Sequence, residues 1–168
     1  MQPRRLLVIR HARAGQSGTT DAERPLADEG VRDAESAGTW LAGQGLRPDH
    51  ALVSAATRAA QTWDALARGA GWELAPDLSR ALYTAEPETA LDLVREVPEE
   101  VVTVAVVGHN PTMGSMAQLL DDGDGDPDAT NDLVASGFPA GAVAVFELDG
   151  AWGDLAWAGA RLVGYRGP

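Results

Sequence analysis

Three short apolar runs constrain the fold of this chain most strongly, because each of them ends on polar side chains. Residues 6–9 lead into Arg10 and His11, residues 50–53 lead into Ser54 with Arg58 one helical turn later, and residues 101–107 lead into His109. If the runs are parallel strands of one sheet, their carboxyl ends lie along the same edge, which is where open α/β sheets bind ligands. We therefore expect two histidines and two arginines to converge on one pocket.

The length of the chain fits a single domain that spans residues 1–168. A protein of 168 residues buries about two-thirds of its unfolded surface, which is enough for a substantial core. The absence of cysteine excludes disulfides and thiolate metal sites. The apolar run near the N-terminus is too short for a signal peptide or a membrane span, and arginines flank it on both sides. We expect a cytoplasmic protein.

The net charge of −12 argues against nucleic acid and membranes as partners, because both need a basic surface. All 13 basic residues are arginine, and a GC-rich genome accounts for that choice. Arginine nevertheless binds phosphate through two parallel N–H groups, which lysine cannot do. In so acidic a chain, the arginines at strand ends are the candidates for a functional role.

The order of predicted elements indicates an α/β protein. Apolar periodicity and Gly/Pro breaks predict helices and strands in turn along the chain. The predicted strands are residues 4–10, 50–53, 72–75, 101–107, 141–148 and 155–160. The predicted helices are residues 28–42, 56–68, 86–97 and a segment that follows Pro111. A turn at Asp149-Gly150 suggests that the last two strands form an antiparallel hairpin. The expected fold is a three-layer α/β/α sandwich with a mixed, mostly parallel central sheet.

The pair Arg10-His11 is the strongest local signal for chemistry. Phosphoryl transfer needs a nucleophile in line with phosphorus and positive charge around the phosphoryl oxygens. A neutral imidazole is a competent nucleophile, and neighbouring arginines discourage its protonation. The alternative is a histidine at a strand end that merely hydrogen-bonds a loop, and the pair alone does not decide between the two.

Several motifs together resemble the histidine phosphatase superfamily. Arg10-His11-Ala12 resembles its Arg-His-Gly signature, with alanine in place of the glycine. Residues 54–62, in which Ser54 precedes Arg58 by four positions, resemble its second signature, and Gly108-His109-Asn110 resembles its third. The stretch 21–26, of sequence DAERPL, and the short length are similar to the SixA-like branch, which contains phosphohistidine phosphatases.

The resemblance implies a role for each matching residue. His11 would be the nucleophile that becomes transiently phosphorylated. Arg10 and Arg58 would hold the phosphoryl oxygens, and His109 would donate a hydrogen bond to them as charge develops. Because arginines and histidines supply the charge, no metal and no other cofactor is expected.

Two further residues are candidates for contact with substrate. Arg24 belongs to the family-like stretch, where it either touches substrate or orders the loop at the entrance. Larger relatives supply a carboxylate general acid between the second and third signatures, and Glu86 is the candidate by position. A carboxylate in the first turn of a helix is also favoured by the helix dipole alone. Arg13 is interpreted as an ordinary loop residue.

The absence of a strong general acid bears on the substrate. An alkyl phosphate has a poor leaving group that the enzyme must protonate, whereas phosphohistidine releases imidazole, which can take its proton from solvent. We therefore expect a metal-independent phosphatase whose partner is a phosphorylated protein carrying phosphohistidine. The alternatives are an enzyme for a small phosphorylated substrate, a phosphomonoesterase, and a catalytically weak phosphate-binding signalling domain.

Three other features have simple structural interpretations. The acidic stretch 121–128 does not have the spacing of an EF-hand, and we interpret it as a solvated, mobile loop. His50 opens a strand at the end opposite the expected pocket, which suggests a structural role. Trp40, Trp63 and Trp157 are predicted to belong to the core.

Overall fold

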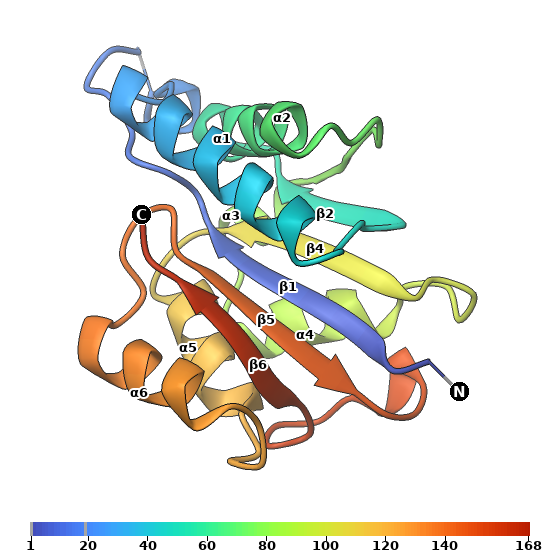
Figure 1. Ribbon diagram of the computed structural model, residues 1–168. Helices are drawn as coiled ribbons and strands as arrows, with labels where there is room; N and C mark the ends of the chain where they lie inside the picture. The colour runs from blue at the N-terminus through green and yellow to red at the C-terminus, as the bar shows by residue number, and fades with distance from the viewer. Residues whose placement is uncertain (1, 19) are drawn as a thin grey trace.

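A six-stranded sheet lies between two layers of helices (Figure 1) in the computed structural model, which describes residues 2–18 and 20–168. The strands are β1 (Arg4–Arg10), β2 (His50–Ser54), β3 (Asp77–Ser79), β4 (Thr103–Gly108), β5 (Val143–Leu148) and β6 (Arg161–Arg166). Their order across the sheet is β3-β2-β4-β1-β5-β6, with the first four parallel and β5 antiparallel to both of its neighbours. The predicted three-layer sandwich with a mixed, mostly parallel sheet is therefore confirmed.

The helices divide between the two faces of the sheet. One face is covered by α1 (Asp28–Gly43) and α2 (Thr57–Ala70). The other face is covered by α3 (Arg80–Tyr83), α4 (Pro87–Arg95), α5 (Thr112–Leu120) and α6 (Pro127–Ser136). Two short 3-10 helices, η1 (Asp21–Glu23) and η2 (Trp152–Asp154), lie in connections. Within residues 2–18 and 20–168, no helix has the length and apolar composition needed to cross a membrane.

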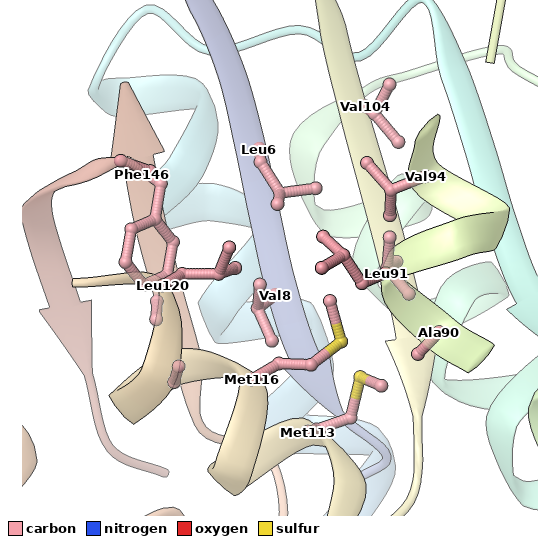
Figure 2. Close-up of a cluster of buried hydrophobic side chains, with 14 of the residues drawn as sticks. Leu6, Val8, Ala90, Leu91, Val94, Val104, Met113, Met116, Leu120 and Phe146 are labelled. Carbon is pink, nitrogen blue, oxygen red and sulfur yellow. The ribbon is translucent and has the colours of Figure 1, made fainter. Parts of the chain in front are cut away.

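The central strands are apolar throughout because helices cover them on both sides. Successive side chains of β1 point to opposite faces, so Leu6 and Val8 enter one core while Leu7 and Ile9 enter the other. Figure 2 shows the first of these cores, in which Met113 of α5 lies beside the sheet. A strand buried on both faces is held firmly, and the polar residues at its end are held with it.

Helices α1 and α2 approach each other closely through two glycines. A Cβ on Gly38 would lie 1.9 Å from the carbonyl oxygen of Leu66, and one on Gly69 would lie 2.0 Å from that of Glu35. The two backbones therefore pack directly against each other. This contact fixes α2, whose first turn carries Arg58.

The short strand predicted at residues 72–75 is wrong. That segment has no regular structure, and the third strand is instead β3, at Asp77–Ser79. Trp72 stacks on Trp63 with ring centroids 5.9 Å apart, and the Trp63 indole N–H donates to the carbonyl of Leu74. The Leu74 carbonyl, which a strand would pair with its neighbour in the sheet, is thus used in a contact with Trp63 of α2.

The last strand is also displaced from its predicted place. Residues 155–160 form an irregular connection with a turn, in which Ala158 has a φ of 56°, and β6 begins only at Arg161. The antiparallel pairing of the last two strands is confirmed, but η2 lies between them. Trp157 is half-buried and donates to Glu88, and Trp40 is half-buried too, whereas Trp63 is fully buried as predicted.

The acidic stretch 121–128 is a loop as far as Asp126, where α6, a helix that was not predicted, begins. The side chains of Asp121, Asp122 and Asp126 each accept from the backbone N–H two residues further on. The backbone N–H groups of Asp122 and Asp126 donate to Ala160 and Leu162. The loop thereby covers one end of the edge strand β6, which limits pairing with other chains there.

Candidate active site

The carboxyl ends of β1, β2 and β4 bring together the four residues that the sequence singled out. His11 directly follows β1, and its backbone N–H donates to the carbonyl of Gly108 at 2.9 Å, which ties the end of β1 to the end of β4. His109 directly follows β4, and its ring centroid lies 5.1 Å from that of His11. Arg58 Nη2 lies 3.4 Å from His109 Nδ1. The predicted convergence at one sheet edge therefore holds geometrically.

The His11 ring is held in one protonation state. Its Nδ1 lies 2.7 Å from the carbonyl oxygen of Ala12, which can only accept, so Nδ1 carries the proton. Burial is the largest cause that lowers the pKa of His11, the Ala12 hydrogen bond opposes it, and the charges of Arg58, Arg10 and Arg24 add to the lowering, so that the pKa is about 4. The ring is thus neutral at physiological pH with a lone pair on Nε2, as a nucleophile requires.

The His109 ring lies between Ser54 and Arg58. A guanidinium only donates, so Nδ1 of His109 accepts from Arg58, and Nε2 carries the proton toward Ser54 Oγ at 2.7 Å. Burial, together with the neighbouring His11 and Arg58, lowers the pKa of His109 to about 4. His109 therefore presents Nδ1 to the space beside Arg58, and this nitrogen can donate there only after it is protonated.

Arg58 is a buried cation that is held from one end. Its Nη1 donates to the backbone oxygen of Asp21 at 2.7 Å, and its Nη2 lies 3.0 Å from the Asp21 carboxylate. The Nε–H is buried and finds no acceptor within residues 2–18 and 20–168. Because unsatisfied buried donors are costly, this group marks a position where an anion would bind.

Arg10 shows the same pattern on the other side of the site. Its Nη1 donates to the carbonyl of Phe138 at 3.2 Å, while its buried Nε finds no acceptor in the described chain. Burial lowers the pKa of Arg10. The carbonyl of Phe138 also accepts from Asn110 at 2.8 Å, so Asn110 fixes the segment that holds Arg10.

Alanine fits at position 12, where the family signature has glycine. Ala12 is fully buried, and its backbone N–H donates to the hydroxyl of Thr62 at 3.0 Å. Its methyl group faces Gly141, whose Cβ position lies 3.9 Å away, an ordinary contact distance. Gly141 has a φ of 87° and donates to the carbonyl of His11, so its left-handed backbone, and not the space beside Ala12, is what favours glycine in this contact.

The other residues named from the sequence differ in whether they contact the site. Arg24 is half-buried, its charge contributes to the lowered pKa of His11, and its Nε lies 3.3 Å from Asp21 Oδ1. Glu86 is exposed at the N-cap of α4, and the described residues provide it with no hydrogen bond or ion pair to the site. Arg13 is an exposed loop residue, as predicted, and pairs with Glu29 at 2.6 Å.

Sequence reasoning missed two residues of the site, Asp21 and Tyr83. The Tyr83 hydroxyl donates to the Asp21 carboxylate, and the Tyr83 ring centroid lies 5.4 Å from that of His109. The hydrogen bonds from Tyr83 and Arg58 lower the pKa of Asp21, which therefore stays ionised at neutral pH. The only signal for Asp21 was its place in the family-like stretch 21–26, and nothing in the sequence singled out Tyr83.

The described part of the chain, residues 2–18 and 20–168, contains no group of three or more His, Cys, Asp or Glu residues arranged to hold a metal ion. The positive charge of the site comes from arginines. Arg10, Arg24 and Arg58 surround His11, and Asp21 is the carboxylate paired with two of them.

Comparisons with known proteins agree with this geometry. Residues 6–83 match the model of the histidine phosphatase superfamily (branch 1). A solved structure from Nakamurella multipartitia, assigned as a phosphohistidine phosphatase SixA, is 37% identical, with a TM-score of 0.86 over 100% of this chain and 98% of that one. The chain belongs to the histidine phosphatase superfamily. It is therefore a phosphatase by class, and its fold is that of the SixA-like members.

Two other SixA proteins show the same relationship. The structure assigned as SixA of Agrobacterium tumefaciens is 30% identical, with a TM-score of 0.80 and complete coverage of both chains. The phosphohistidine phosphatase SixA of Escherichia coli is 28% identical, over 78% of this chain and 83% of that protein. This histidine phosphatase thus matches SixA proteins over most of its length, beyond the three signatures.

Proposed function

We propose that this histidine phosphatase removes the phosphoryl group from phosphohistidine in a protein, with His11 as the nucleophile. The observation that carries the proposal is the state of His11. Its Nδ1 is committed to the Ala12 carbonyl, and its pKa is about 4. The nearby Arg10 and Arg58 each have a buried N–H for which residues 2–18 and 20–168 provide no acceptor. A neutral nucleophile beside unsatisfied cationic donors suits attack on a phosphoryl group.

In the first step, the lone pair of His11 Nε2 forms a bond to phosphorus while the bond from phosphorus to the leaving group breaks. Arg10 and Arg58 hold the phosphoryl oxygens through their free Nε–H groups. The proton on His11 Nδ1 stays on the ring, where the Ala12 carbonyl accepts its hydrogen bond and stabilises the positive charge that develops. The product is a phosphohistidine at position 11 and a free leaving group.

In the second step, water attacks phosphorus and the bond to His11 Nε2 breaks. The electron pair of that bond returns to Nε2, and the proton lost by water leaves with the phosphate or passes to solvent. His109 contributes once the bound phosphoryl dianion favours protonation of its Nδ1, because that nitrogen then donates to a phosphoryl oxygen. Its Nε2–H remains toward Ser54 throughout.

The environment of Glu86 supports phosphohistidine over alkyl phosphates. Glu86 is exposed, and in the described residues it makes no hydrogen bond to the site, so it is not positioned to deliver a proton there. Asp21 is ionised and carries no proton to give, and the Tyr83 hydroxyl donates its hydrogen bond to the Asp21 carboxylate. A phosphohistidine substrate needs none of these groups as an acid, since its second ring nitrogen takes up a proton from solvent and imidazole leaves neutral. The SixA relatives are named for the same substrate.

The proposal is tested by comparing substrates with leaving groups of different basicity. Purified protein is assayed on a phosphohistidine protein, an aryl phosphate and a set of sugar phosphates, with and without EDTA. We expect kcat/KM to fall in that order and EDTA to leave every rate unchanged. Efficient hydrolysis of a sugar phosphate would favour the small-molecule phosphomonoesterase, and binding of phosphate without turnover of any substrate would favour a phosphate-binding signalling domain.

A further inference from the structure

Tyr83, three residues before the general-acid candidate Glu86, contributes to the site by contacting Asp21 of η1. Tyr83 lies at the end of α3, where its ring faces His109 and lies 5.9 Å from the Arg58 guanidinium carbon. Its hydroxyl donates to the same Asp21 oxygen that receives Arg58 Nη2. The other carboxylate oxygen of Asp21 faces Arg24 Nε. One carboxylate therefore contacts two arginines and the tyrosine.

The direction from which Asp21 approaches Arg58 determines which N–H groups of the guanidinium stay available for a ligand. Asp21 receives Nη1 with its backbone oxygen and Nη2 with its carboxylate, so it covers the end of the guanidinium. The second hydrogen of Nη2 points to the side of the group that also carries Nε–H, and His109 Nδ1 lies there, 3.4 Å from Nη2. Nε–H itself is buried and has no acceptor in the described chain. Asp21 thus leaves free the edge that faces the histidines.

We propose that Asp21 and Tyr83 form a positioning pair, which holds Arg58 by the end of its guanidinium so that the Nε edge is presented to a phosphoryl oxygen. Neither residue touches the phosphoryl group, and both act through Arg58. The inference rests on the proposed function, because it assumes that the free Nε edge binds phosphate.

The pair makes a prediction opposite to that of simple electrostatics. Asp21→Asn removes a negative charge next to an anion site, so charge alone would tighten the binding of a phosphate dianion. If Asp21 positions Arg58, the same substitution loosens the guanidinium and weakens phosphate binding. Tyr83→Phe keeps the ring against His109 and Arg58, changes no charge, and removes only the hydrogen bond to Asp21. The two variants together separate position from charge.

The experiment measures the binding of inorganic phosphate by calorimetry at neutral pH. We expect Asp21→Asn to raise the Kd about tenfold, as for the loss of one hydrogen bond between charged groups, and Tyr83→Phe to raise it about threefold. In an Arg58→Ala background, adding Asp21→Asn should change the Kd less than about twofold, since residues that act through one partner are not additive. Asp64→Asn, which removes an exposed charge on the same helix α2, serves as the charge control.

The phosphate-binding measurements on these variants can contradict either the positioning pair or the proposed function. Thermal unfolding of each variant establishes that it is folded, and Asp21 is exposed, so its substitution opens no core. Unchanged or tighter phosphate binding by Asp21→Asn would overturn the positioning pair while leaving His11 as nucleophile. An effect of Asp21→Asn that persists without Arg58 would also overturn it. Failure of the wild-type protein to bind phosphate would instead contradict the proposed function itself.

Discussion

The sheet carries arginines at both of its ends, but the two ends balance that charge differently. At the amino end, a cavity of about 310 Å³ is lined by Arg4 together with Glu99 and Asp149. Arg4 Nη2 lies 2.9 Å from the Glu99 carboxylate, and its Nη1 donates to the carbonyl of Gly150. The positive charge at this end is already matched by carboxylates of the protein.

At the carboxyl end, Arg10, Arg24 and Arg58 surround His11, and the Asp21 carboxylate pairs with Arg24 and Arg58. Arg10 and Arg58 also keep buried N–H groups for which the described residues provide no acceptor. The comparison teaches that the volume of a cavity does not identify the site in this protein. The balance of charge does. Arg4 is paired with Glu99, although its buried Nε also lacks an acceptor among the described residues, whereas the three arginines near His11 exceed the charge of the Asp21 carboxylate, and an added anion would balance them.

The sharpest way to break this comparison is to remove one group from each end. We expect His11→Ala to abolish turnover while the protein stays folded, because no other group supplies the nucleophile. Arg4→Ala, at the opposite end, should leave kcat and KM unchanged. Circular dichroism measures the folded fraction of each variant, and the rates are corrected for it. Normal turnover by His11→Ala would show that the carboxyl end has been misinterpreted.

A smaller effect is expected when the charge is kept and only its geometry is changed. Arg58→Lys retains the positive charge but loses the planar fork of N–H groups, so kcat/KM should fall by about 10²-fold. Arg95→Lys is the matched control, since Arg95 is also a helical arginine with several partners but contacts Leu155 and Asp92 instead. Steady-state kinetics on an aryl phosphate measures both, and a loss below threefold for Arg58→Lys would place Arg58 outside the phosphate site.

Burial of His11 at the carboxyl end should also make the stability of the protein depend on pH. The pKa of His11 is about 4 in the folded protein and near 6.5 when unfolded. The unfolded chain therefore binds more protons between these values, and the contribution of His11 to the free energy of unfolding, present above pH 6.5, is lost as the pH falls toward 4.

We expect the protonation of His11 on unfolding to lower the free energy of unfolding by roughly 1–2 kcal/mol between pH 7 and pH 5. His11→Asn should reduce the pH dependence of urea unfolding by that amount. An equal pH dependence in wild type and His11→Asn would mean that His11 is not desolvated.

The smallest effect is expected at Glu86. Glu86→Gln should change the rate on a phosphohistidine protein less than about twofold, because imidazole leaves without help from the enzyme. Its effect should grow with the basicity of the leaving group, from aryl to alkyl phosphates. A large loss on a sugar phosphate that the wild type hydrolyses efficiently would make Glu86 a general acid.

The part of the site that lies at strand ends could be predicted from the sequence. Apolar runs fix where β1, β2 and β4 stop, and parallel strands place their ends together, so His11, Arg58 and His109 follow from the pattern. The structure brings these residues together as expected. Their roles in catalysis remain predictions for the experiments above.

The part of the site formed by irregular segments could not be predicted in this way. Asp21 lies in the short 3-10 helix η1 and Tyr83 in a helix of one turn, and their contact joins segments 62 residues apart. No periodicity reports such a contact. The last strand was misplaced for a similar reason, because Leu155 and Ala160 are buried in an irregular connection and not in a regular strand.

The central claim is that His11 carries the phosphoryl group, and trapping the intermediate tests it most directly. The wild-type protein is mixed with a substrate that carries labelled phosphorus, quenched within milliseconds in base, and digested for mass spectrometry. The account predicts an acid-labile, base-stable label on the peptide that contains His11, and no label in His11→Ala. A label on the peptide that contains His109, or an equal label in His11→Ala, would contradict it.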